Sequence, residues 1–144
     1  MGQKISINST INLPKDTVWK YYTSPEHIIH WNFADPSWHC PSAENDMKVG
    51  GKYKARMEAK DGSFGFDFEA IYTSLSQGNN FVYRMEDGRE SEVVFTDLDG
   101  KTELQVTFDA ESQNSIDLQR NGWQTILDNF KRYAETLSMV ENAG

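Results

Sequence analysis

The chain has 144 residues and a formal net charge of −8 at pH 7. This length fits one domain, spanning residues 1–144, and is enough to bury a core without disulfides. Nucleic acid and anionic membranes both require a basic face on the protein, so the acidic balance disfavours both as partners.

Cys40 is the only cysteine, so no internal disulfide can form, which is typical of a reducing compartment. The N-terminal residues alternate apolar and polar side chains and contain no apolar run typical of a signal peptide. Met1-Gly2 matches the start of a myristoylation signal, but the residues after it match a strand better. No apolar run approaches membrane-spanning length. The sequence therefore predicts a cytoplasmic protein.

The N-terminal third predicts one strand followed by two short helices. Residues 3–11 alternate apolar and polar side chains, which indicates a strand. Pro14 suits the first turn of a helix, and Ser24-Pro25 suits the N-cap and first position of a second helix. Two short helices are therefore expected within residues 14–30.

Residues 31–45 are rich in aromatic side chains but lack a regular period. Such a segment is costly to leave in water, so we expect it to lie against something apolar. It is predicted to plug one end of the fold as an irregular segment.

From residue 45 onward the pattern is that of strands separated by glycine-containing turns. Residues 52–60 place Tyr53, Ala55, Met57 and Ala59 on one face. Asp61-Gly62 predicts a hairpin turn. The strands that follow are predicted at residues 64–72, 81–85, 89–97 and 101–109, which makes an antiparallel meander with one apolar face.

The C-terminal region predicts one long helix, with Asn114 or Ser115 as its cap. About 24 residues at about 1.5 Å each span roughly 36 Å, which is enough to cross the sheet. Its apolar residues recur at helical spacing: Ile116, Trp123, Ile126, Leu127, Phe130, Ala134 and Leu137. Gly122 could allow the backbone or a ligand to approach closely beside Trp123, or it could serve only helix–sheet packing. An α+β fold follows, in which a curved antiparallel sheet wraps one helix and leaves an apolar cavity.

The polar residues near the aromatic segment do not form a recognisable metal site. His30, Asp35, His39 and Cys40 are donor types that zinc accepts, but no CxxC or HxxxH pair is present. We therefore predict no metal and no cofactor, with Cys40 as a small buried residue and His27 as an exposed one.

Motifs for enzymatic catalysis are also missing. The chain has no Gly-x-Ser-x-Gly elbow and no glycine-rich phosphate loop. Tyr53, Tyr72, Tyr83 and Ser91 are the polar groups expected to project into a cavity. No catalytic residue is assigned, and enzymatic activity is left open.

Four stretches of the chain resemble a known family, the one named for an activator of the heat-shock-protein-90 ATPase, within the helix-grip (START-like, SRPBCC) superfamily. They are PKDTVWKYYTSPEHIIHW, WNFADPSWHCPSAENDMKVGGKY, DGSFGFDFEAIY and NGWQTILDNFKRY. The resemblance covers residues 5 to about 137. It implies about seven antiparallel strands curved around the long C-terminal helix, with two short helices after the first strand.

We expect the chain to bind a small hydrophobic or aromatic molecule between the sheet and the C-terminal helix. The residues expected to contact it are Trp31, Phe33, Trp38, Tyr53, Met57, Phe64, Phe66, Phe68, Tyr83, Trp123, Leu127 and Phe130, with the first three at the mouth. The resemblance also implies two alternatives, a co-chaperone that activates a heat-shock-protein-90 ATPase and a cyclase- or hydrolase-type enzyme. An exposed aromatic loop could also support a homodimer.

Overall fold

The computed structural model describes residues 3–143, so Met1-Gly2 and the question of lipid attachment lie outside the described residues. The elements follow one another in the order β1 (Lys4–Ile11), α1 (Lys15–Thr23), α2 (Pro25–Ile28), β2 (Trp38–Asn45), β3 (Lys52–Ala59), β4 (Gly65–Ser76), β5 (Asn80–Met85), β6 (Glu90–Asp97), β7 (Thr102–Asp109) and α3 (Ile116–Ala143).

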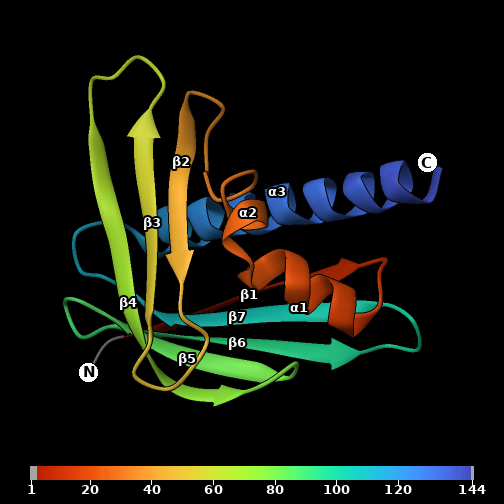
Figure 1. The fold of residues 1–144 in the computed structure, drawn as a ribbon. Coiled ribbons are helices and arrows are strands. Elements are labelled where there is room, and N and C mark those ends of the chain that lie inside the picture. The colour runs from red at the N-terminus through yellow and green to blue at the C-terminus, as the bar shows by residue number, and fades with distance from the viewer. Residues whose placement is uncertain (1–2, 144) are drawn as a thin grey trace.

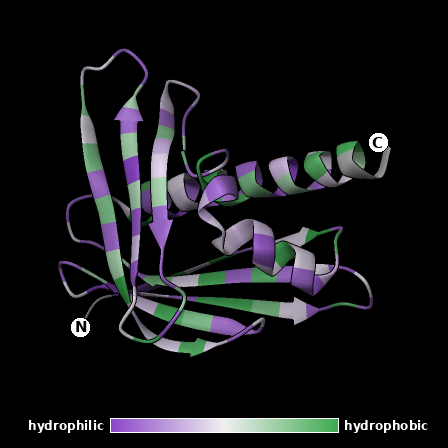
Figure 2. Cartoon of the chain, in the orientation of Figure 1, coloured by the Kyte–Doolittle hydropathy of each residue, from purple (hydrophilic) through white to green (hydrophobic). Residues whose placement is uncertain are grey.

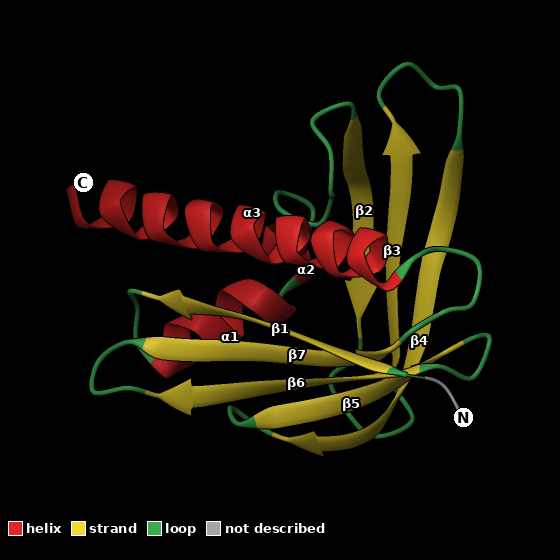
Figure 3. Cartoon of the chain, turned by 180° about the vertical axis from the view of Figure 1, so that it is seen from behind, coloured by secondary structure: helices red, strands yellow, loops and turns green. Residues whose placement is uncertain are grey.

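All seven strands belong to one antiparallel sheet, in the order β1-β7-β6-β5-β4-β3-β2. The sheet is strongly curled, and α3 lies across its hollow side together with α1 and α2 (Figures 1 and 3). This arrangement confirms the predicted α+β helix-grip fold, with its long C-terminal helix and two short helices after β1.

The curl of the sheet comes from β4, which changes partners along its length. Residues 65–71 pair with β3, whereas residues 70–76 pair with β5. An irregularity in the register between Tyr72 and Ser74 marks the change. Bulges bend a strand and increase its local twist. As a result, β2 and β3 stand at a steep angle to β5, β6, β7 and β1 (Figure 1).

Side chains alternate along the strands between the hollow face and solvent, as the sequence predicts. Ile5, Ile7 and Ile11 of β1 are buried, as are Val93 and Phe95 of β6. Figure 2 shows the same alternation as bands of hydrophobic and hydrophilic residues along each strand. The buried face packs against the helices and forms the core.

Helix α3 begins at Ile116, and the Ser115 hydroxyl accepts a hydrogen bond from the Leu118 N–H at 3.1 Å. Ser115 therefore caps the helix, as expected. The helix is anchored to the sheet by Trp123, whose ring stacks on Phe108 with centroids 3.9 Å apart and planes 10° apart. Along the described residues, the helices lack the length or the apolar run needed to span a bilayer.

The structure corrects two expectations from the sequence. Residues 38–45 were expected to be irregular, but they form β2, the edge strand that pairs with β3. A register shift between His39 and Ser42, at Cys40-Pro41, breaks the alternation that would have marked the strand. In addition, Gly122 permits no close approach, because a Cβ built there meets nothing within 4 Å.

Gly51→Ala is expected to destabilise the protein by about 1–3 kcal/mol, the usual cost of overpacking. A Cβ at Gly51 would lie 2.1 Å from the backbone oxygen of Asp46, in the turn that leads into β3. The measurement is the free energy of unfolding in urea, followed by far-UV circular dichroism.

Gly122→Ala is the matched control for this change. The same added methyl group meets open space there, in the interior of a helix, so it should raise the free energy of unfolding by up to about 1 kcal/mol. If both variants were destabilised equally, the steric reason given for Gly51 would be wrong.

Candidate functional site

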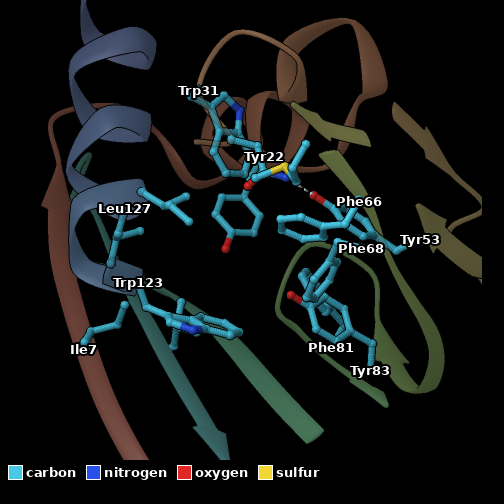
Figure 4. Close-up of a pocket in the computed structure, with 14 residues that line it drawn as sticks. Ile7, Tyr22, Trp31, Tyr53, Phe66, Phe68, Phe81, Tyr83, Trp123 and Leu127 are labelled. Carbon is cyan, nitrogen blue, oxygen red and sulfur yellow. Dashed lines mark hydrogen bonds between the residues drawn. The ribbon is translucent and has the colours of Figure 1, made fainter. Parts of the chain in front are cut away.

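A pocket of about 220 Å³ lies between the hollow face of the sheet and α3 (Figure 4). Its walls come from α1, the segment after α2, strands β1, β3, β4, β5 and β7, and α3. The lining residues are Ile7, Tyr22, Trp31, Asn32, Tyr53, Met57, Phe66, Phe68, Phe81, Tyr83, Val106, Trp123, Ile126 and Leu127.

Eight of the twelve residues expected from the sequence to contact a ligand line this pocket. They are Trp31, Tyr53, Met57, Phe66, Phe68, Tyr83, Trp123 and Leu127. Strand alternation places those from β3, β4 and β5 on the hollow face, opposite the helical residues Trp123 and Leu127. Phe66 is 43% exposed while lining the pocket, so it forms part of the rim.

The other four expected residues lie outside the pocket. Phe130 is fully buried and packs edge-on against Tyr22 and Trp31, behind the pocket wall. Phe33 is half-buried, and its backbone carbonyl accepts a hydrogen bond from the Asn129 side chain at 2.6 Å. This bond holds the segment after α2 against α3.

Trp38 and Phe64 form a cluster with Phe66 at the tip of the β3–β4 hairpin and the start of β2. The ring of Trp38 lies 5.8 Å from that of Phe64 and 6.0 Å from that of Phe66. Phe64 is 61% exposed because β4 runs past the end of the helical cover. Of these three aromatic residues, only Phe66 reaches the pocket.

Six lining residues were not among those expected from the sequence: Ile7, Tyr22, Asn32, Phe81, Val106 and Ile126. Alternation along β1, β5 and β7 could have identified Ile7, Phe81 and Val106, and helical spacing had already marked Ile126 as a core residue of α3. Tyr22 shares one face of α1 with Val18 and Trp19, which predicts a core position without identifying the pocket, and Asn32, from the segment after α2, carried no such signal.

Three hydroxyl groups and one side-chain amide line the pocket, and we call these four residues the tyrosine end (Tyr22, Asn32, Tyr53 and Tyr83). The Asn32 side-chain amide donates a hydrogen bond to the Tyr53 hydroxyl at 3.1 Å. The Tyr22 hydroxyl points into the middle of the pocket (Figure 4). The tyrosine end is therefore the polar part of a pocket whose remaining lining residues are apolar or aromatic.

Burial keeps these tyrosines protonated. It raises the pKa of Tyr22 and of Tyr53 well above the usual value, and neighbouring tyrosine hydroxyls add to both shifts. Burial also raises the pKa of Tyr83 to about 12, which the nearby Ser91 hydroxyl partly offsets. Ser91 lies opposite Tyr83 in the register of β5 and β6, and its hydroxyl makes no hydrogen bond of good geometry to the described residues.

Tyr72 packs against Tyr83 but does not line the pocket. Its hydroxyl donates a hydrogen bond to the side-chain oxygen of Asn45 at 2.6 Å, and the Asn45 amide donates to the Thr23 carbonyl at 2.6 Å. This chain of bonds ties β4 to β2 and α1. Tyr72 thus has a structural partner, whereas Tyr22 makes no hydrogen bond to the described residues.

The residues considered for a metal site are not brought together. His30 and Asp35 are exposed, and the His39 ring lies 3.9 Å from a Glu58 carboxylate oxygen. Within residues 3–143 no group of three His, Cys, Asp or Glu side chains could hold a metal ion. Of these residues, only Cys40 is buried.

Cys40 and His27 are both less accessible than a reactive site requires. Cys40 is 3% exposed, as predicted, and burial raises the pKa of its thiol to about 11. His27 was expected to be exposed but is half-buried, and its Nδ1 lies 2.7 Å from the Tyr133 hydroxyl. The helix α3 covers it, a long-range contact that the local pattern of α2 does not encode.

Comparison with known proteins identifies relatives of this chain over nearly its full length. The family model for "Activator of Hsp90 ATPase homolog 1-like protein" matches residues 12–135. The solution structure of an AHSA1-like protein from Aeromonas hydrophila is 42% identical, with a TM-score of 0.89 and 94% of each chain covered. The solution structure of Chr148 from Cytophaga hutchinsonii is 40% identical, with a TM-score of 0.81 and the same coverage.

The fold also extends to distant proteins. A protein from Nitrosomonas europaea is 13% identical with a TM-score of 0.80, covering 94% of this chain and 96% of its own. This likeness shows the fold alone. Among curated proteins, no significant match was found.

The buried tyrosines predict that stability is lost in alkali. In the folded state their pKa values lie above those of the unfolded chain, so below about pH 10 both states are protonated and the contribution is complete. As the pH rises through 10 toward the folded pKa values, the unfolded state alone loses protons. The free energy of unfolding should therefore fall steeply above pH 10, which urea unfolding at pH 8 to 11.5 would measure. A flat profile would contradict the burial of these hydroxyls.

Proposed function

This chain belongs to the family of activator of Hsp90 ATPase homolog 1-like proteins, and within that fold we propose that it binds a small, largely apolar molecule in the pocket beneath α3. The observation that carries the proposal is a hollow walled by aromatic and aliphatic side chains from both the sheet and the helix. Pockets for small molecules have this composition, with a few polar groups that set the ligand's orientation.

The size of the pocket supports this proposal. An apolar cavity of about 150 Å³ is enough to bind benzene, and this one measures about 220 Å³. An empty cavity of that size costs on the order of 5 kcal/mol relative to a filled core. This is comparable to the whole stability of a small domain. A bound molecule would restore much of the lost packing.

The lining supports binding in preference to acid–base catalysis. The lining residues include no Asp, Glu, His, Lys or Arg, and the tyrosines are their only titratable groups. General acid–base catalysis at neutral pH needs a group whose pKa lies near the working pH. The buried tyrosines are shifted away from that range.

The family description supplies a second candidate, activation of a heat-shock-protein-90 ATPase through a protein surface. The exposed cluster of Trp38, Phe64 and Phe66 is the part of the described surface that best suits such a role, because exposed aromatic groups mark interaction sites. This candidate does not involve the interior of the pocket, so the two can be tested separately.

Ligand binding should appear in a ¹⁵N–¹H NMR titration with two-ring aromatic compounds and medium-chain fatty alcohols. At least one class should give saturable shifts that centre on the amides of the lining residues, and should raise the melting temperature. The absence of saturable shifts across the panel would contradict the proposal.

A matched pair of variants locates the binding. Ile126→Trp places a large ring on the α3 wall of the pocket and should weaken binding at least tenfold. Met139→Trp adds the same ring to the same helix, at a residue that is 71% exposed and lies outside the pocket, and should leave affinity unchanged. Equal loss in both variants would place the ligand elsewhere.

The co-chaperone candidate predicts that the chain raises the ATPase rate of a bacterial heat-shock-protein-90 homologue. If the aromatic cluster is the contact, Phe64→Ser should abolish the increase, whereas Ile126→Trp should preserve it. An ATPase rate that does not respond to a molar excess of this chain would remove the candidate.

A further inference from the structure

We propose that the ligand of this pocket is an uncharged aromatic molecule carrying a hydrogen-bond acceptor, such as a ketone oxygen, which is received by the hydroxyls of the tyrosine end. This inference rests on the proposed function and adds the chemical class of the ligand. It follows from which hydroxyl groups already have partners, and from the absence of ionised groups in the lining.

The tyrosine end has hydrogen-bond donors that the protein itself does not use. The Tyr22 hydroxyl makes no hydrogen bond to the described residues and points into the pocket (Figure 4). The Tyr53 hydroxyl accepts its bond from Asn32, so its own hydrogen remains available. Because an unpaired hydroxyl in apolar surroundings is costly, these donors favour a ligand that brings an acceptor.

Tyr72 shows that the arrangement is specific to the pocket. Its side chain is also buried, yet its hydroxyl donates to Asn45 at 2.6 Å and the residue does not line the pocket. Among these neighbouring tyrosines, the unused donors are therefore those on the pocket side.

The lining also determines the charge of the ligand. It contains no cationic side chain to pair with a carboxylate and no carboxylate to pair with an ammonium group. The tyrosines are protonated at neutral pH, and burial raises their pKa values further. A charged ligand would lose its hydration without gaining an ionic partner, so the pocket favours a neutral molecule.

The aromatic side chains that line the pocket favour a flat ring. Trp123 is held against Phe108 with planes 10° apart, so its indole is fixed where it lines the pocket. Phe68 and Phe81 add two further aromatic side chains. Aromatic side chains pack well against planar rings, by stacking or edge to face.

The test uses four naphthalenes that differ in one substituent at position 2: acetyl, isopropenyl, carboxylate and trimethylammonium. Acetyl and isopropenyl have nearly the same shape, but only acetyl carries an acceptor oxygen. Dissociation constants are measured at pH 7.5 by NMR titration on the wild type and on three variants, Tyr22→Phe, the double variant Tyr22→Phe/Tyr53→Phe, and Tyr72→Phe. Thermal unfolding by circular dichroism checks that each variant is folded.

The double variant should bind acetylnaphthalene about 5- to 20-fold more weakly and isopropenylnaphthalene within twofold of the wild type. Tyr22→Phe alone should show part of the same selective loss. If the double variant does not fold, the single variant still tests the inference. Tyr72→Phe removes a hydroxyl of the same kind outside the pocket and should leave the ratio of the two affinities unchanged. Both charged naphthalenes should bind at least tenfold more weakly than acetylnaphthalene.

Two outcomes would overturn the inference while leaving the proposed function standing. In one, the variants that lack the Tyr22 hydroxyl lose affinity equally for both neutral compounds, or lose affinity for neither. In the other, a charged compound binds as tightly as acetylnaphthalene. If none of the four compounds binds the wild type, including the purely apolar isopropenylnaphthalene, the proposed function fails and the inference fails with it.

Discussion

Residues 65–71 of β4 pair with β3, and residues 70–76 pair with β5. Only Ala70 and Ile71 therefore pair with both neighbouring strands. A sheet joined through so short an overlap can fold back on itself at that point. The two halves then face each other across an angle that α3 bridges on the hollow side (Figures 1 and 3). Because one straight helix cannot fill an angled surface, the pocket lies where the two halves and the helix meet. The change of partners along β4 thus determines where the hollow forms.

Much of this fold could be predicted from local patterns. Period-two alternation marked the inward residues of β3, such as Tyr53 and Ala55, and helical spacing marked those of α3, such as Leu127. The edge strand β2 was missed because a register shift at Cys40-Pro41 and partial burial remove the alternation on which the prediction depends. The bend in β4 could not be predicted either. Phe64, Phe66 and Phe68 continue the same alternation, although this part of the strand extends beyond the helices that cover the sheet.

The candidate site could be predicted in part, for a related reason. Alternate side chains of a strand point to opposite faces of the sheet, so the residues that the sheet contributes to the pocket could largely be predicted. Tyr22 and Asn32 lie on a helix and on an irregular segment, where direction depends on how those pieces dock. The sequence therefore predicted two of the four residues of the tyrosine end, Tyr53 and Tyr83, and missed the two that are not on strands. The position of the Tyr22 hydroxyl depends on how α1 docks against the sheet.

The contrast between an acidic exterior and a lining without ionised groups has a kinetic consequence. The net charge of −8 is spread outside the hollow, and long-range steering acts only on molecules that are themselves charged. The neutral ligand proposed above would arrive by unbiased diffusion, so its rate of association should be nearly insensitive to ionic strength.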